Sequence, residues 1–195
     1  MIVDIEKIVD TLKRNGSVVA IKTDTVYGLV CNAYDKDSTD KIYKLKSREK
    51  KKPLSLFVKD IDEVKKYVSS HSLTSKNVKI MEKYWPGALT IIFEKKDDTF
   101  SHFTEGVSGI GIRIPDDEIL KKILSRCDFP LAETSCNLSG EEPYDDIKAI
   151  REKFDGKVDL IVDGGKVLDN RPSTVISLEA NELLVIRKGS IDIDV

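Results

Sequence analysis

The chain has few of the residues on which common covalent and metal-dependent chemistries rely. It contains two histidines, His71 and His102, both in polar stretches that look like loops. A Ser–His–Asp or Cys–His nucleophile and a histidine metal site are therefore disfavoured. Its three cysteines, Cys31, Cys127 and Cys136, are widely spaced and odd in number, which argues against a disulfide framework and a CxxC metal pair. This usage is typical of a reducing compartment, so we expect a cytoplasmic location.

Long apolar runs and nucleotide-binding loop signatures are also lacking. No stretch approaches the roughly 20 apolar residues of a membrane span, and the first ten residues contain no apolar core typical of a signal peptide. Neither GxxxxGK[ST] nor GxGxxG occurs, and DGGK at 163–166 does not have the phosphate-loop spacing. The net charge of −2 gives no whole-protein attraction to nucleic acid. We therefore expect no membrane contact, and any basic site must be local.

The sequence instead alternates helical and extended patterns over 195 residues, enough for one good core. Apolar spacing predicts helices over 5–12, 60–68, 74–84, 116–126 and 145–154, and a further helix capped by Ser38 or Thr39. Strands are expected over 17–21, 54–58, 89–93, 109–114, 130–134, 159–163, 173–178 and 182–187. Because the last three strands follow one another, the pattern favours a single α/β or α+β domain over 1–195 with a mixed sheet.

The most basic stretch is KLKSREKKKP, Lys44–Pro53, in which six residues are basic and Glu49 alone is acidic. One interpretation is a solvated helix end, because lysines are favourable near a helix C-terminus. The other is a cradle for nucleotide phosphates or an RNA backbone, because so many like charges need solvent or an anion to compensate them. Charge alone does not decide between the two.

Three other stretches raise similar questions. KTDTVYGLV, Lys22–Val30, is either a strand ending at a helix cap or the wall of a site. ETSCNLSGEEPY, Glu133–Tyr144, offers hydroxyl and amide groups that suit phosphate or ribose but also make ordinary turns. Arg113 stands among isoleucines, and a buried arginine needs either a structural carboxylate or the carboxylate of a bound small molecule. Arg187 poses the same question at a strand end.

Seven stretches occur in an order that matches one known family. They are TDTVYGL (23–29), KSREKKKPLSLFV (46–58), WPGALT (85–90), GIRIP (111–115), TSCNLSG (134–140), RPSTV (171–175) and IRKGSI (186–191). With these motifs the chain, from about residue 16 to 191, resembles the YrdC-like family of L-threonylcarbamoyladenylate synthases. The resemblance implies an α/β sandwich around a twisted, mixed and mostly parallel sheet, with a basic cavity on one side.

The resemblance also implies a nucleotidyltransferase reaction. The family condenses L-threonine, bicarbonate and ATP into threonylcarbamoyl-AMP and pyrophosphate with the help of Mg²⁺, and a separate transferase passes the threonylcarbamoyl group to the tRNA adenosine beside the anticodon. Such chemistry needs positioning and charge compensation more than a protein nucleophile. The alternative is a related protein that binds double-stranded RNA, or a nucleotide for regulation, without synthase activity.

The family signature pairs Lys-x-Arg with Ser-x-Asn. By resemblance, the catalytic residues are Lys46, Arg48, Ser135 and Asn137. The residues expected around ATP are Arg48, Lys52, Ser135, Tyr144 and Arg187. Those expected around threonine are Thr25, Arg113 and Ser173, and no protein metal ligand is implied.

Four positions depart from the family pattern. Lys22 replaces a usual proline, and Phe57 replaces a histidine that some members place near threonine. Gly109 stands where many members have a nucleotide-contacting Thr or Ser, which removes one expected contact. Glu133 occupies a position that is usually small and apolar, and the pattern gives it no partner. Because the resemblance ends near the C-terminus, we expect the short form of the family, without an added domain.

Overall fold

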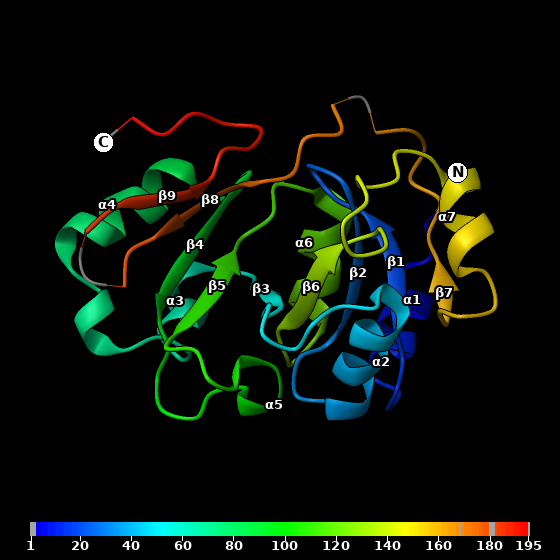
Figure 1. The fold of residues 1–195 in the computed structure, drawn as a ribbon, viewed down its shortest axis with the longest axis horizontal. Coiled ribbons are helices and arrows are strands. Elements are labelled where there is room, and N and C mark those ends of the chain that lie inside the picture. Colours follow the sequence, from blue (N-terminus) through cyan, green and yellow to red (C-terminus); the bar gives the residue numbers. More distant parts are fainter. Residues whose placement is uncertain (1–2, 168, 180–181, 195) are drawn as a thin grey trace.

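The computed structural model describes residues 3–167, 169–179 and 182–194, which form an open nine-stranded sheet flanked by helices (Figure 1). The strands are β1 (Val19–Lys22), β2 (Tyr27–Asn32), β3 (Ser55–Phe57), β4 (Leu89–Glu94), β5 (Gly109–Arg113), β6 (Leu131–Ser135), β7 (Leu160–Ile161), β8 (Thr174–Ser177) and β9 (Leu184–Arg187). The helices are α1 (Ile5–Leu12), α2 (Lys36–Lys46), α3 (Ile61–Val64), α4 (Ser75–Tyr84), α5 (Ser101–Thr104), α6 (Glu118–Arg126), α7 (Ile147–Phe154) and a short 3₁₀ turn (Ser70–Ser72). The single domain expected over 1–195 also includes residues 1, 2, 168, 180, 181 and 195, which lie outside the described part.

The strand order is β7-β1-β2-β6-β3-β5-β4-β8-β9. Among the described strands, the pairs β7–β1, β3–β5 and β4–β8 are parallel, and the other five pairs are antiparallel. The expected α/β class with a mixed sheet is confirmed. The expectation that the sheet is mostly parallel is wrong. Three consecutive strand pairs, β1–β2, β4–β5 and β8–β9, are antiparallel, and β6 lies antiparallel to both of its neighbours, β2 and β3.

Two hydrophobic cores lie on opposite faces of the sheet. The larger core contains apolar side chains from α2, α4 and α7, such as Ile42, Met81 and Phe154. On the other face, α1 and α6 pack against β1, β2 and the start of β6, with Leu12 and Leu124 in the second core. Strand residues alternate between the two faces of the sheet. The strand register therefore decides which side chains lie on the part of the second face that α1 and α6 do not cover.

Most expected elements form near the positions that the sequence predicts, with ends that differ by a few residues, and two helices illustrate the reasons. The helix expected over 60–68 is helical only from Ile61 to Val64, because Tyr67 N–H donates to the carbonyl three residues back, as in a turn. The helix expected to begin at Ser38 or Thr39 begins earlier, with Asp35 as its N-cap. The carboxylate of Asp35 accepts hydrogen bonds from Asp37 N–H and the Ser38 hydroxyl, so this residue does the capping.

The stretch Lys22–Val30 is the turn and second strand of a β-hairpin. Lys22 ends β1, residues 23–26 make the turn, and β2 begins at Tyr27. The sequence prediction contains no strand at β2. In the described part of the chain, no helix has both the length and the apolar character needed to cross a membrane.

Candidate functional site

A cavity of about 220 Å³ lies over the sheet face that α1 and α6 leave uncovered. Small residues on neighbouring strands, Gly28, Ser55 and Gly111, make its floor. Register places Glu133 opposite Ser55 and Ser135 opposite Gly28, so both side chains lie on this face. A Cβ at Gly111 would lie 3.2 Å from the Ser55 hydroxyl oxygen, which explains how the glycine keeps this part of the floor low.

Six of the residues predicted from sequence line this cavity. They are Thr25, Arg48, Arg113, Ser135, Ser173 and Arg187. They come from the β1–β2 turn, the segment after α2, and strands β5, β6 and β9 with the approach to β8. Four other predicted residues, Lys46, Lys52, Asn137 and Tyr144, are not in the lining. The structure therefore brings together residues separated by up to 162 positions and leaves the others behind or beside the cavity.

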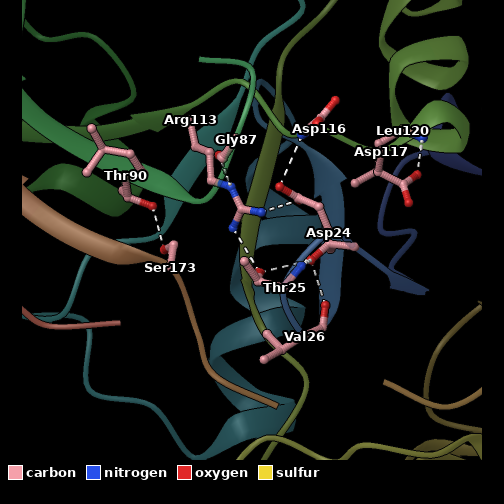
Figure 2. A network of polar contacts seen from close by, with 12 residues as sticks. Asp24, Thr25, Val26, Gly87, Thr90, Arg113, Asp116, Asp117, Leu120 and Ser173 are labelled. Atoms are coloured by element: carbon pink, nitrogen blue, oxygen red, sulfur yellow. Dashed lines mark hydrogen bonds and ion pairs between the residues drawn. The ribbon is translucent and has the colours of Figure 1, made fainter. Parts of the chain in front are cut away.

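Arg113 is the most completely partnered cation of the site (Figure 2). Its side chain is only 3% exposed, and one of its nitrogens, Nη2, forms an ion pair with Asp24. Its Nε donates to the Gly87 carbonyl at 3.1 Å, and its Nη1 donates to the Thr25 hydroxyl at 3.0 Å. The sequence left open whether Arg113 has a structural or a ligand carboxylate, and a structural partner is present. Three of its five N–H groups are used in this way.

The turn after β1 fixes the position of Thr25. The Thr23 hydroxyl donates to the Val26 carbonyl at 2.7 Å and accepts a hydrogen bond from Thr25 N–H at 3.1 Å. The two threonine hydroxyl oxygens are 3.1 Å apart. The turn expected from Thr23 and Asp24 is thus present, and it also presents Thr25 and Asp24 to the Arg113 guanidinium.

Arg187 and Ser173 contact each other in the cavity. Nη2 of Arg187 donates to the Ser173 carbonyl at 2.9 Å and to its hydroxyl at 3.3 Å. The Ser173 hydroxyl also lies 2.8 Å from the Thr90 hydroxyl, as Figure 2 shows. Among the described residues, no carboxylate forms an ion pair with Arg187, so its charge has only neutral acceptors.

Arg48 has the same kind of partners. Helix α2 ends at Lys46, its C-cap Ser47 has φ of +49°, and the chain then turns back on itself. Nε of Arg48 donates to the Lys52 carbonyl and Nη2 to the Pro53 carbonyl, both at 2.8 Å. No described carboxylate pairs with Arg48, and the side chain of Lys52 is exposed. Lys52 thus contributes its main chain rather than its charge to the arrangement.

Each motif of the signature has one residue in the cavity lining and one behind it. Arg48 and Ser135 line the cavity, whereas Lys46 and Asn137 do not. Lys46 is 1% exposed, and its ammonium donates to the Asn137 carbonyl at 2.7 Å, the Asn137 Oδ1 at 2.8 Å, and the Ser135 carbonyl. The Ser135 hydroxyl donates to the same Oδ1 at 2.6 Å. Burial, and secondarily the charge of Arg48, lowers the pKa of Lys46 to about 8. Lys46 and Asn137 therefore hold the strand end that presents Ser135.

Two further positions that the resemblance singled out are Tyr144 and Gly109. The Tyr144 hydroxyl donates to Glu141, and burial raises its pKa to about 12. At Gly109 a Cβ would lie 2.6 Å from Ile92 Cγ2 and 2.8 Å from the Glu179 carboxyl carbon. A side chain at this position would therefore displace its neighbours, which explains the glycine. The neighbouring Ser108 hydroxyl donates to Glu179 at 2.7 Å.

Glu133 is a carboxylate inside this cationic cavity. Within the described part of the chain, no group donates a hydrogen bond to it or lies within ion-pair distance of it. Burial raises the pKa of the Glu133 carboxyl, although the nearby arginines favour its ionised form, with Arg113 the strongest. The sequence analysis identified Glu133 as a departure from the family pattern but did not predict that it lines the cavity.

Sequence reasoning missed several lining residues, among them Ser55, Thr90 and Pro172. Ser55 and Thr90 lie on predicted strands, where each is a polar residue next to apolar ones, so the face on which they lie could be predicted. The order of the strands in the sheet could not be predicted from the sequence. Nothing therefore indicated that these two hydroxyls share a cavity.

Comparison with known proteins is consistent with this geometry. The Sua5/YciO/YrdC family model, described as telomere recombination, matches residues 11–189. A Methanocaldococcus jannaschii protein, named provisionally as a threonylcarbamoyl-AMP synthase, is 38% identical over 96% of this chain and 88% of its own length. A Bacillus subtilis threonylcarbamoyl-AMP synthase is 34% identical over 92% of this chain, which spans only 52% of that relative.

A solved structure extends the comparison. Pyrococcus abyssi Sua5 complexed with L-threonine matches with a TM-score of 0.87 and 28% identity, covering 95% of this chain and 54% of that one. The chain therefore corresponds to about half the length of the Sua5 protein and of the Bacillus relative. Since the family model spans most of the sequence and the fold agrees, this chain belongs to the Sua5/YciO/YrdC family.

Proposed function

We propose that the chain is an L-threonylcarbamoyladenylate synthase, a nucleotidyltransferase that makes threonylcarbamoyl-AMP and pyrophosphate from L-threonine, bicarbonate and ATP. The observation that carries the proposal is the pair Arg48 and Arg187, whose guanidinium groups line one cavity and hold only neutral oxygens. Arginines that form no ion pair with a carboxylate suit a polyanion such as a triphosphate. The names of the relatives and the threonine complex of the Pyrococcus protein support the rest of the assignment.

The substrates take different walls in this proposal. Arg48 and Arg187 bind ATP phosphates, and Ser135, held by Asn137, lies beside them. The wall of Thr25, Ser173 and Arg113 takes L-threonine, because it combines two hydroxyls with two remaining guanidinium N–H groups. Lys46 and Asn137 act by positioning, since neither lines the cavity.

The reaction itself then requires little covalent help from the protein. The amine of threonine combines with bicarbonate to form a carbamate and water, and a carbamate oxygen attacks the α-phosphorus of ATP, releasing pyrophosphate. Positioning the two reactants and compensating phosphate charge supply the catalysis. Among the described residues, no group of three or more His, Cys, Asp or Glu side chains is arranged so that it could hold a metal ion. Mg²⁺ therefore enters this proposal bound to the phosphates of ATP rather than in a protein cage.

The proposal extends to the use of the product. A separate transferase would take threonylcarbamoyl-AMP and modify the tRNA adenosine beside the anticodon, in the cytoplasm. Direct contact with tRNA or double-stranded RNA is the competing role for the basic segment, where Lys44, Lys51 and Lys52 are exposed and Lys50 pairs with Asp40 at 2.8 Å.

Omission of single substrates tests the proposal. Pyrophosphate release is measured with ATP, L-threonine and bicarbonate, and then without each one in turn. We expect release to need all three. Release that ignores threonine would contradict the proposal. RNA binding that falls steeply with salt, combined with no pyrophosphate release, would instead favour the binding protein.

A further inference from the structure

Glu133 is an acidic side chain in a cavity whose other charged residues are arginines. It extends from β6 between Ser55 of β3 and Val30 of β2, on the face where Ser55, Gly111 and Gly28 leave space above the sheet. Three arginines line the same cavity, yet in the described residues none is paired with Glu133. Arg113 uses Asp24, while Arg48 and Arg187 use carbonyl and hydroxyl oxygens.

This arrangement argues against two ordinary roles. A structural ion pair would place Glu133 on one of the arginines, and each of them donates elsewhere. A resident metal site would need further carboxylate, histidine or cysteine ligands, and no such cluster exists among the described residues. The carboxylate is therefore available to a cationic, hydrogen-donating group of a ligand that enters the cavity.

We propose that Glu133 receives the α-ammonium group of L-threonine and takes one proton from it. The inference rests on the proposed function, because it names one group of that substrate. Among the atoms of threonine, bicarbonate and ATP, the ammonium is the cationic centre, and it must become a neutral amine before it reacts. Arg113, Thr25 and Ser173 on the neighbouring wall face the carboxylate and hydroxyl of the same molecule, so that the amino acid is held at both charges.

The proton transfer is simple to balance. One N–H bond of the ammonium breaks, its electron pair stays on nitrogen, and the proton moves to a Glu133 oxygen. The neutral amine then forms the C–N bond with bicarbonate, and the C–OH group leaves as water with a second amine proton. Burial raises the pKa of Glu133, which brings its basicity closer to that of an effective general base near neutral pH.

The test compares Glu133→Gln with the wild type, and Glu179→Gln serves as a matched control. Glu179 lies beside Gly109 at the cavity edge without lining it, so the same chemical change is made outside the site. Calorimetry measures the affinity of L-threonine, ATP and 3-hydroxybutanoate, which is threonine without its amine. Threonine titrations in two buffers of different ionisation enthalpy report proton exchange on binding, and pyrophosphate release across pH 6–9 reports turnover.

We expect Glu133→Gln to weaken L-threonine binding by about tenfold or more, through loss of a charge-assisted hydrogen bond. Affinity for 3-hydroxybutanoate should not change, and affinity for ATP should stay equal or rise, because a negative charge near the phosphates is removed. The acid limb of the turnover profile should be lost. Glu179→Gln should match the wild type in all five measurements, namely the three affinities, the proton exchange and the turnover profile.

Several results would overturn the inference. Equal losses for threonine and 3-hydroxybutanoate would show a general disturbance of the pocket, and a shift confined to the Mg²⁺ dependence would show a metal-binding role. Unchanged threonine binding and an unchanged pH profile would show that Glu133 has no role. If wild-type turnover ignores threonine, the proposed function fails; the Glu133 inference fails separately when threonine binding itself is insensitive to Glu133→Gln.

Discussion

The two cationic walls of the cavity differ in how their charge is compensated. Arg113 is buried and forms an ion pair with Asp24, so the protein itself balances it. Arg48 and Arg187 donate to carbonyl and hydroxyl oxygens, and no described carboxylate pairs with either one. The difference suggests a division of labour in which the balanced wall suits a zwitterionic amino acid and the unbalanced wall suits a polyanion.

The comparison also changes what a substitution at each wall should do. Removing a residue from a buried ion pair leaves an uncompensated charge behind, and this costs far more than the pair contributes net. Removing an arginine that holds main-chain carbonyls leaves neutral acceptors that water can reach at the cavity surface. Substitution of Arg113 should therefore mainly lower the free energy of unfolding, whereas substitution of Arg48 or Arg187 should mainly lower turnover.

The largest expected effect is on stability, at Arg113. Arg113→Ala leaves the Asp24 carboxylate without its ion-pair partner, and we expect the free energy of unfolding to fall by about 3–5 kcal/mol. Arg48→Ala should lower it by about 1–2 kcal/mol, since it removes two hydrogen bonds to carbonyls. Urea denaturation of both variants measures the difference. The double variant with Asp24→Asn should recover part of the Arg113 loss; equal costs for the two single variants would contradict the division into balanced and unbalanced walls.

The second effect concerns the choice of amino acid. Serine lacks one methyl group of threonine, and pockets reject a missing methyl by only about 10–200-fold. Valine has a methyl group in place of the hydroxyl, so an apolar group would lie against the polar atoms of Thr25 and Ser173, and rejection should be much stronger. We expect serine to be a poor but measurable substrate and valine to be inactive in pyrophosphate release. Comparable rates for serine and valine would show that Thr25 and Ser173 do not recognise the hydroxyl group of threonine.

The third effect tests the unbalanced wall. A lysine at position 48 keeps the charge but has no planar fork for two phosphate oxygens. Arg48→Lys should lower turnover by about tenfold or more, which corresponds to ~1.5–3 kcal/mol for a charge-assisted contact, while the fold persists. Lys52→Met is the control, because the Lys52 side chain is exposed and outside the cavity lining. Near-normal kinetics for Arg48→Lys, or an equal loss for Lys52→Met, would indicate a general basic surface.

The sequence allowed one wall to be predicted better than the other. The signature residues Arg48 and Ser135 were identified from motifs and do line the cavity. The state of Arg113 was not predictable, because its partner Asp24 lies 89 residues away and only the pairing of strands brings them together. Local patterns specify helices and strands, whereas strand order depends on contacts between distant segments. The same limit explains why the parallel-to-antiparallel balance was missed, whereas β2 is a local element that the sequence analysis did not identify.

The smallest effect sharpens the comparison by adding a fourth cation, Lys46, which lies behind the cavity. Burial lowers the pKa of Lys46 from 10.5 to about 8. Between these values the unfolded chain binds more protons at this lysine than the folded protein does, so this residue makes the folded state relatively more stable as pH rises from about 8 towards 10.5. Over the step from pH 8 to pH 9 the gain should be on the order of 1 kcal/mol. Lys46→Met removes the titrating group, so the difference in unfolding free energy between wild type and variant should grow with pH over this interval. A difference that stays constant from pH 7 to 9.5 would mean that Lys46 keeps its full charge against the oxygens of Ser135 and Asn137, as a cation open to solvent would.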